Sequence, residues 1–236
     1  CISVGTPSRE NGSLDLRAIE IVSSQIGAVL KEKNAPHTIV VRSTLLPGTT
    51  RDLIVPALEK ASGKVVGHDI HVCYNPEFLR EGSSIKDFYD PPYTIIGQTG
   101  EAAGDAGAAL YSGVEAPIHR VSIEVAEGIK YVCNCFHALK VGFANEVGVI
   151  MKSLGVDSYP VMKLVCEDKK LNISPAYLMP GYAFGGSCLP KDVRAITYHA
   201  RSRDLDLPML NSVMPSNVSH IQRSVDMVLA SGKKRI

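Results

Sequence analysis

Residues 118–154 read IHRVSIEVAEGIKYVCNCFHALKVGFANEVGVIMKSL, and within this stretch the chain changes from one kind of structure to another. Ile118–Val121 is a short run typical of a strand. From Ser122 or Ile123 to about Leu154 the sequence continues without an evident break, which predicts one long helix. The boundary between two structural classes is therefore expected near residue 120.

Before this boundary, short apolar runs alternate with longer amphipathic stretches. The strand candidates are Cys1–Val4, Thr38–Val41, Ile70–Cys73, Tyr93–Ile96 and Ile118–Val121. The helix candidates are Asp15–Lys33, Thr50–Ala61 and Glu101–Ser112. This alternation predicts an α/β fold with a doubly wound, Rossmann-like parallel sheet. Ligands are then expected at the carboxyl ends of the strands.

After the boundary the sequence shows helical patterns, and no strand signal as strong as those before it appears. Further helices are expected at Ser158–Lys169, Leu189–Arg203 and Leu207–Ala230. We therefore predict a partial Rossmann-like domain over residues 1–120 and a helical central domain over 121–230. Both ends look cut, since the chain opens directly on a strand and lacks a G-x-G-x-x-G turn. An N-terminal βαβ unit is expected to be missing, and residues 231–236 to begin a missing C-terminal domain.

Bulk composition excludes several classes of function. The 236 residues carry a net charge of only +1, so no overall field attracts nucleic acid or an anionic membrane. Neither a membrane-spanning apolar run nor a signal peptide is evident. The six cysteines are scattered without a C-x-x-C pair, so we expect no metal site and a reducing, cytoplasmic location. All except Cys188 are expected to be small buried hydrophobes.

The glycine-rich block PGYAFGGSCLPKD at residues 180–192 carries the strongest chemical signal. Its serine, proline and aspartate are typical of a helix start, which would place Cys188 at a helix N-terminus. The helix dipole and the nearby Lys191 would favour a thiolate there, as a nucleophile requires. The alternative is a glycine-rich loop with a buried cysteine.

A second signal lies on the long helix. Lys130, Asn134, His137 and Asn145 are spaced to lie roughly along one stripe of an otherwise apolar helix. An ammonium and amides suit a sugar hydroxyl or a developing oxyanion. The alternative is an ordinary solvated face.

Two further segments follow strands. In NPEFLREG at residues 75–82, a helical turn would put Glu77 and Glu81 on one face, where carboxylates suit acid–base work. In RSTLLPGTT at residues 42–50, hydroxyls follow a strand, and Thr49 or Thr50 is a candidate cap for the next helix. The alternative in both cases is an ordinary surface turn.

Taken in order, these segments resemble the UDP-glucose/GDP-mannose dehydrogenase family over essentially the whole chain. The resemblance rests on VGTP at 4–7, RSTLLPGT at 42–49, NPEFLREG at 75–82, ExxKYxxN at 127–134, FANE at 143–146 and FGGSCLPKD at 184–192. The stretch IKYVCNCFHALKV at residues 129–141 and the cysteine block at 180–192 look closest to the GDP-mannose branch, and the UDP-glucose branch remains an alternative.

The resemblance implies an NAD-dependent, four-electron oxidation of a nucleotide-sugar C6 alcohol to the carboxylate through a thioester on Cys188. Matching positions imply further catalytic roles for Lys130, Asn134, Asp192, Glu77 and Thr44. They imply cofactor contacts for Thr6, Thr44, Glu81 and Lys191. They imply substrate contacts for Glu81, Lys130, Asn134, His137, Asn145, Tyr177, Tyr182 and Gly185. The substrate implied is GDP-mannose, and the partner a second copy in a homodimer.

The chain departs from the GDP-mannose branch at Ala176 and Met179, where that branch has a tyrosine and an arginine. Losing a guanidinium removes a bidentate phosphate partner, which leaves the nucleotide and sugar open. Three rival functions remain: a two-electron hydroxyacid-type dehydrogenase, a catalytically inactive dimerising fragment, and a cysteine acyl-transfer hydrolase. We expect this piece alone to bind NAD⁺ and substrate poorly.

Overall fold

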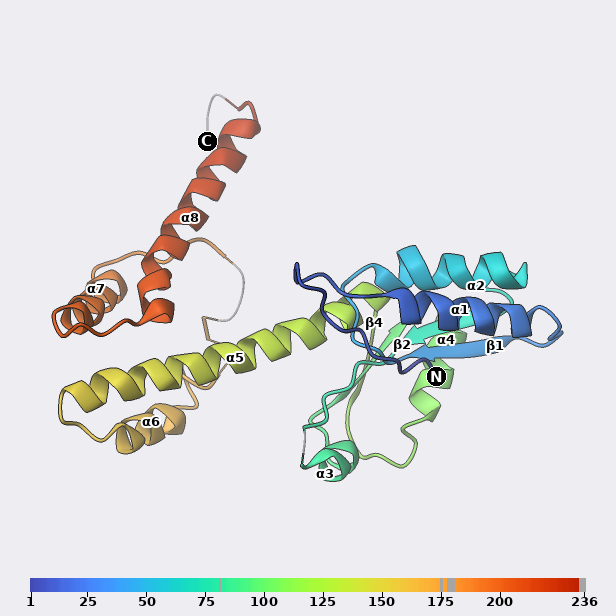
Figure 1. Ribbon diagram of the computed structural model, residues 1–236, viewed down its shortest axis with the longest axis horizontal. Coiled ribbons are helices and arrows are strands. Elements are labelled where there is room, and N and C mark those ends of the chain that lie inside the picture. Colours follow the sequence, from blue (N-terminus) through green and yellow to red (C-terminus); the bar gives the residue numbers. More distant parts are fainter. Residues whose placement is uncertain (81, 175, 178–180, 234–236) are drawn as a thin grey trace. The chain divides into compact units, whose positions relative to one another are not determined.

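The computed structural model describes residues 1–80, 82–174, 176–177 and 181–233 (Figure 1). The chain forms two compact units, residues 1–135 and 136–236, and the long helix α5 (Ile123–Ser153) contributes to both. The predicted helix from Ser122 or Ile123 to about Leu154 is confirmed. The domain limits 1–120 and 121–230 remain a prediction.

A four-stranded sheet forms the centre of the first unit. The strands β1 (His37–Val41), β2 (Ile70–Tyr74), β3 (Thr94–Gln98) and β4 (Ile118–Val121) lie side by side in this order. Ile39 and Val41 pack on one face with the helices α1 (Arg17–Leu30), η1 (Thr50–Ile54) and α2 (Val55–Ser62). Val40 packs on the other face with α4 (Glu101–Ala109). Helices on both faces confirm the doubly wound, Rossmann-like architecture.

Two sequence expectations about the sheet need correction. The pairs β1–β2 and β3–β4 are parallel, but β3 runs antiparallel to β2. Among the described residues between these strands, the helix is the six-residue α3 (Ser84–Tyr89), and its rise of about 9 Å is too short to return along a strand of about 16 Å. The expected strand Cys1–Val4 is reduced to an isolated parallel bridge between Ile2 and Val41.

Helix α5 begins in close contact with β3 at a glycine. A Cβ atom on Gly97 would lie 2.7 Å from Ala126 Cβ and 2.9 Å from Ile123 Cα. Gly97→Ala must therefore push the first turn of α5 away, and we expect it to lower the free energy of unfolding by about 1–3 kcal/mol. Urea denaturation measures this loss. Gly113→Ala, where nothing lies within 4 Å, is the control, and equal losses for both variants would contradict the close packing.

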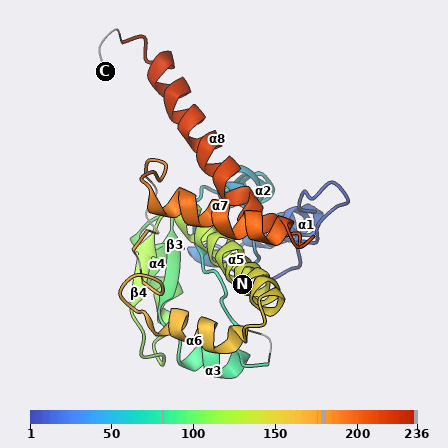
Figure 2. The same ribbon diagram turned by 90° about the vertical axis from the view of Figure 1, so that its left-hand side faces the viewer.

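The second unit contains the rest of α5 and the helices α6 (Ser158–Glu167), α7 (Cys188–Arg201) and α8 (Pro208–Ala230). The three helices predicted after residue 154 are thus confirmed within one or two residues at each end. A short turn joins α7 to α8, and α8 then continues away from α7 (Figure 2). The small core here comprises Ile150, Ala200, Leu207 and Leu210. Among the described residues, no helix is both long and apolar enough to cross a membrane.

Candidate active site

Two of the predicted cofactor residues lie side by side in the first unit. The Ile2 bridge aligns the VGTP segment with the end of β1, so Thr6 and Thr44 follow neighbouring extended segments. The Thr6 hydroxyl donates to the Thr44 carbonyl at 2.9 Å. These hydroxyls lie at the carboxyl edge of the sheet, where doubly wound folds bind ligands.

Buried and part-buried hydrogen bonds hold the Thr44 segment on both sides. The Ser43 hydroxyl donates to the Val4 carbonyl at 2.7 Å and accepts from the Val4 N–H at 2.8 Å. The Tyr74 hydroxyl donates to the Ser43 carbonyl at 2.9 Å and accepts from the Leu45 N–H at 3.3 Å. Burial raises the pKa of Tyr74 to about 12, so the phenol keeps its proton and remains a donor at neutral pH.

The start of the following helix is capped by a distant carboxylate. Glu127 of α5 is fully buried and accepts from Gly48 N at 2.6 Å and from Thr50 N at 2.8 Å. The predicted cap by Thr49 or Thr50 is wrong, because the Thr49 hydroxyl donates back to the Leu46 carbonyl instead. Burial raises the pKa of Glu127, and the two N–H donors offset this only in part.

Lys130 lies one helical turn after Glu127. Its ammonium lies 5.4 Å from the centroid of the Phe78 ring, and Phe78 packs edge-on against Tyr93. This cation–π contact links α5 to the NPEF segment at residues 75–78. Asn134, the next member of the predicted stripe, is exposed in this chain.

Glu77 does not lie on a helix as expected. Residues 75–80 form an irregular segment after β2, since Pro76 disfavours helical geometry in the residue before it. The Glu77 carboxylate accepts from the N–H of Leu79, which makes a local turn. Glu81 lies outside the described residues. Asn75 is buried and bonded to the Ile95 carbonyl and to the Tyr111 hydroxyl.

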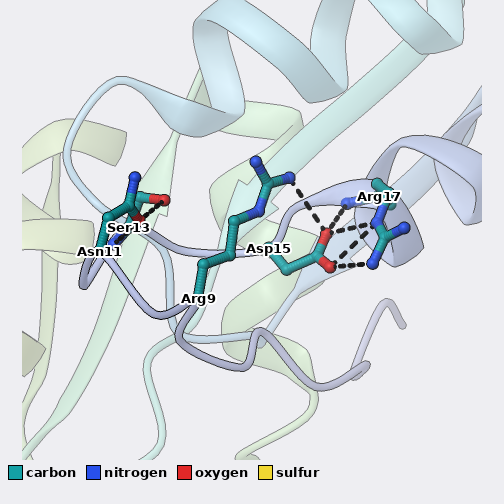
Figure 3. A network of polar contacts seen from close by, with 5 residues as sticks. All are labelled: Arg9, Asn11, Ser13, Asp15 and Arg17. Atoms are coloured by element: carbon teal, nitrogen blue, oxygen red, sulfur yellow. Dashed lines mark hydrogen bonds and ion pairs between the residues drawn. The ribbon is translucent and has the colours of Figure 1, made fainter.

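The loop after Thr6 contains a separate ion network (Figure 3). The Asp15 carboxylate lies between the guanidinium groups of Arg9 and Arg17, and the Arg17 hydrogen bond holds the pKa of Asp15 well below its usual range. The Asn11 side chain accepts from both the N–H and the hydroxyl of Ser13. Asp15 thus offsets positive charge next to the VGTP segment.

In the second unit, Cys188 occupies the first position of α7 and is exposed, which confirms the predicted helix start. Its sulfur lies 3.8 Å from the Ser187 hydroxyl. Lys191 and Asp192 form an exposed ion pair at 3.4 Å. The expectation that the other cysteines are buried is wrong except for Cys73 and the half-buried Cys133, because the rest lie at the N-terminus or on exposed helix faces.

The predicted substrate residues of the second unit are all exposed. They comprise His137 and Asn145 on α5, together with Tyr177, Tyr182 and Gly185 before α7. Tyr177 has a positive φ of 62°, an uncommon conformation for an aromatic residue. Met179 lies outside the described residues, and Ala176 lies in a turn. No group of three or more candidate metal ligands occurs in the described parts of the chain.

The sequence analysis predicted no supporting role for four residues: Glu127 and Glu146, which it quoted only within motifs, and Asn217 and His220. Glu146 accepts from Met209 N at 2.6 Å and from Leu210 N at 2.9 Å, and so caps α8 as Glu127 caps η1. A signal existed for Glu127, since Ile123, Ala126, Glu127 and Lys130 share one face at helical spacing. A carboxylate on the buried stripe of a helix needs a partner.

Comparisons with known proteins agree over the whole chain. Two sequence models match, the UDP-glucose/GDP-mannose dehydrogenase family NAD binding domain over residues 1–115 and its central domain over 124–219. GDP-mannose 6-dehydrogenase of Pseudomonas syringae pv. tomato is 55% identical over 100% of this chain and 54% of its own length. UDP-glucose 6-dehydrogenase AglM of Haloferax volcanii is 35% identical over 96% of this chain and 54% of its own length.

The crystal structure of a ternary complex of GDP-mannose dehydrogenase from Pseudomonas aeruginosa matches with a TM-score of 0.94 at 52% identity. This match covers 96% of the present chain and 52% of that chain. The molecule is thus a Rossmann-like α/β unit of the NAD-binding type followed by a helical unit with a long central helix. The chain belongs to the UDP-glucose/GDP-mannose dehydrogenase family. It spans about half the length of the relatives that it matches.

Proposed function

We propose that this protein is an NAD-dependent nucleotide-sugar 6-dehydrogenase that oxidises a sugar C6 alcohol to the carboxylate through a thioester on Cys188. The observation that carries the proposal is the exposed thiol at the first position of α7. A helix start stabilises a thiolate, and a thiolate forms acyl intermediates readily.

Thr6 and Thr44 are the proposed cofactor-binding residues of the first unit, with Glu81 and Lys191 as further contacts. Hydroxyls at the carboxyl edge of a doubly wound sheet, next to the open backbone at Gly5, fit the ribose of a dinucleotide. NAD⁺ would supply the hydride acceptor for both oxidations.

The residues of the chain would supply the remaining chemistry. The Cys188 sulfur adds to the aldehyde carbon, and a C–S bond forms as the carbonyl oxygen gains negative charge. The ammonium of Lys130, assisted by Asn134, would stabilise that oxygen. The second oxidation gives the thioester, and a water molecule then cleaves the C–S bond. The proton that this water loses would be taken up and passed on by Asp192, Glu77 and Thr44. This hydrolysis releases the carboxylate and returns the thiol.

Lys130→Met tests the proposed role of the ammonium. The variant keeps an apolar side chain against Phe78 but has no charge to stabilise the oxyanion, so we expect carboxylate formation to slow by about 100-fold to 1000-fold. Lys140→Met is the matched control on the same helix, since the Lys140 ammonium lies 4.8 Å from the centroid of the Phe136 ring. A Lys130 variant as fast as this control would remove Lys130 from the mechanism.

The substrate that we propose is GDP-mannose, with UDP-glucose as the second candidate. High identity to GDP-mannose 6-dehydrogenases favours the first, whereas the departures at Ala176 and Met179 keep the second open. The test is a steady-state assay of the full gene product with each nucleotide sugar. We expect two NADH per carboxylate formed and faster turnover of GDP-mannose. One NADH per product would instead indicate a two-electron dehydrogenase.

The proposed assembly is a homodimer in the reducing cytoplasm. Large apolar side chains such as Val132, Leu139 and Val141 are exposed along α5 in this chain, which suits a covering partner. Light scattering combined with the NADH assay would identify an inactive dimerising fragment, for which dimerisation occurs without NADH production.

A further inference from the structure

The loop that leads into Cys188 has little packing of its own. Gly181, Gly185 and Gly186 leave open space around their backbones, and Gly186 adopts a φ of 77°. Across residues 181–188 only Ala183 and Phe184 are even half-buried. Glycine permits many backbone conformations, so the glycines alone do not fix the position of the thiol.

Two side chains of α8 hold this loop by its backbone. The Asn217 amide accepts from Phe184 N at 3.0 Å and donates to Phe184 O at 2.9 Å, so a single side chain satisfies both polar groups of one residue. Three residues later on the helix, His220 Nε2 lies 2.8 Å from Gly181 O. The loop is thereby tied to α8 at two points, which lie four and seven residues before Cys188.

Helix α8 is itself anchored. The Glu146 carboxylate binds the N–H groups of Met209 and Leu210 in its first turn. Leu207 and Leu210 are buried in the core with Ile150 of α5 and Ala200 of α7. Asn217 therefore lies on a helix whose first turn is held in place, and the helix continues through Pro215 two residues earlier.

We propose that Asn217, assisted by His220, is a positioning residue for Cys188. The Asn217 amide fixes the Phe184 backbone, and this keeps the Cys188 sulfur at the start of α7, where the free N–H groups stabilise a thiolate. The inference rests on the proposed role of Cys188 as the nucleophile.

The test is the rate of iodoacetamide labelling at Cys188 in the full gene product, followed by peptide mass spectrometry. Cys166, an exposed thiol on α6, is the internal reference. We expect Asn217→Ala to lower the Cys188 rate relative to Cys166 by about tenfold. Asn211→Ala is the matched control, since the amide of this asparagine of α8 donates to the Asp206 carboxylate at 3.4 Å and not to the loop at residues 181–187. A ratio within twofold of the wild type, or a higher ratio, would overturn the proposal.

His220→Ala is a second variant, because His220 is exposed and its loss threatens folding less. We expect the same labelling ratio to fall by about threefold. In turnover with GDP-mannose, Asn217→Ala should lower kcat and leave the KM for NAD⁺ unchanged. General destabilisation would not change kcat alone in this way. If the wild type forms no carboxylate, the proposed function fails, and the labelling ratio still tests the positioning.

Discussion

Cys188→Ala is expected to abolish carboxylate formation while the protein remains folded. Without the sulfur no acyl adduct forms, so oxidation stops at or before the aldehyde. Removing a covalent nucleophile typically costs a factor of at least about 1000 in rate. The measurement is chromatographic quantification of alcohol, aldehyde and carboxylate after incubation with NAD⁺. Since Cys188 is exposed, the change should leave the free energy of unfolding nearly unchanged.

Cys166→Ala is the matched control, because Cys166 is also an exposed helical thiol. Full turnover by this control and none by Cys188→Ala would assign the chemistry to one sulfur. A two-electron hydroxyacid-type dehydrogenase does not need Cys188, so carboxylate formation at the wild-type rate by Cys188→Ala would favour that rival.

Among the substitutions proposed here, Glu127→Ala is expected to cause the largest loss in the free energy of unfolding. The change leaves Gly48 N and Thr50 N without their acceptor in a buried environment and opens space under the start of η1. Each buried N–H left unsatisfied costs about 1–3 kcal/mol, so we expect the free energy of unfolding to fall by about 2–5 kcal/mol. Urea denaturation followed by circular dichroism measures this loss.

Glu124→Ala is the matched control one turn earlier on α5. Glu124 is partly exposed and forms an ion pair with Arg51 at 3.2 Å, which is worth less than about 1 kcal/mol. Equal losses for the two variants would contradict the capping role of Glu127.

The stability contributed by Glu127 should also depend on pH with a definite sign. Burial raises its pKa in the folded protein, so the folded state binds this proton more tightly than the unfolded chain does. The contribution is therefore present below the unfolded pKa and is lost as the pH rises through the folded pKa. Relative to Glu127→Gln, wild-type stability should fall as the pH rises from about 4 to 7. A constant or rising difference would be inconsistent with a raised pKa.

Local patterns predicted the helices and most strands because these depend on neighbouring residues. The long helix from Ile123, the start of α7 at Cys188 and the three helices after residue 154 all followed from periodicity and capping residues. The antiparallel pairing of β2 and β3 was not predicted, because the direction of a strand depends on the path of the chain that connects it to its neighbour.

Interactions between distant residues explain the errors at the candidate site. The N–H groups at the start of η1 are capped by Glu127, which lies more than seventy residues away in the sequence. The local sequence does not show this partner, so a neighbouring threonine was predicted as the cap. The backbone of Phe184 is held by Asn217 in the same manner. The family resemblance suggested the proposed roles of Cys188 and Lys130, whereas the side chains that contact their surroundings became visible in the structure.

The most direct test of the central claim is mass spectrometry of the full gene product quenched during turnover with NAD⁺ and GDP-mannose. A covalent intermediate on the cysteine predicts a peptide containing Cys188 that carries the added mass of the sugar-nucleotide acyl group and loses it with hydroxylamine. Carboxylate accumulation with Cys188 unmodified throughout turnover, and no acyl adduct in rapidly quenched samples, would contradict the proposed thioester.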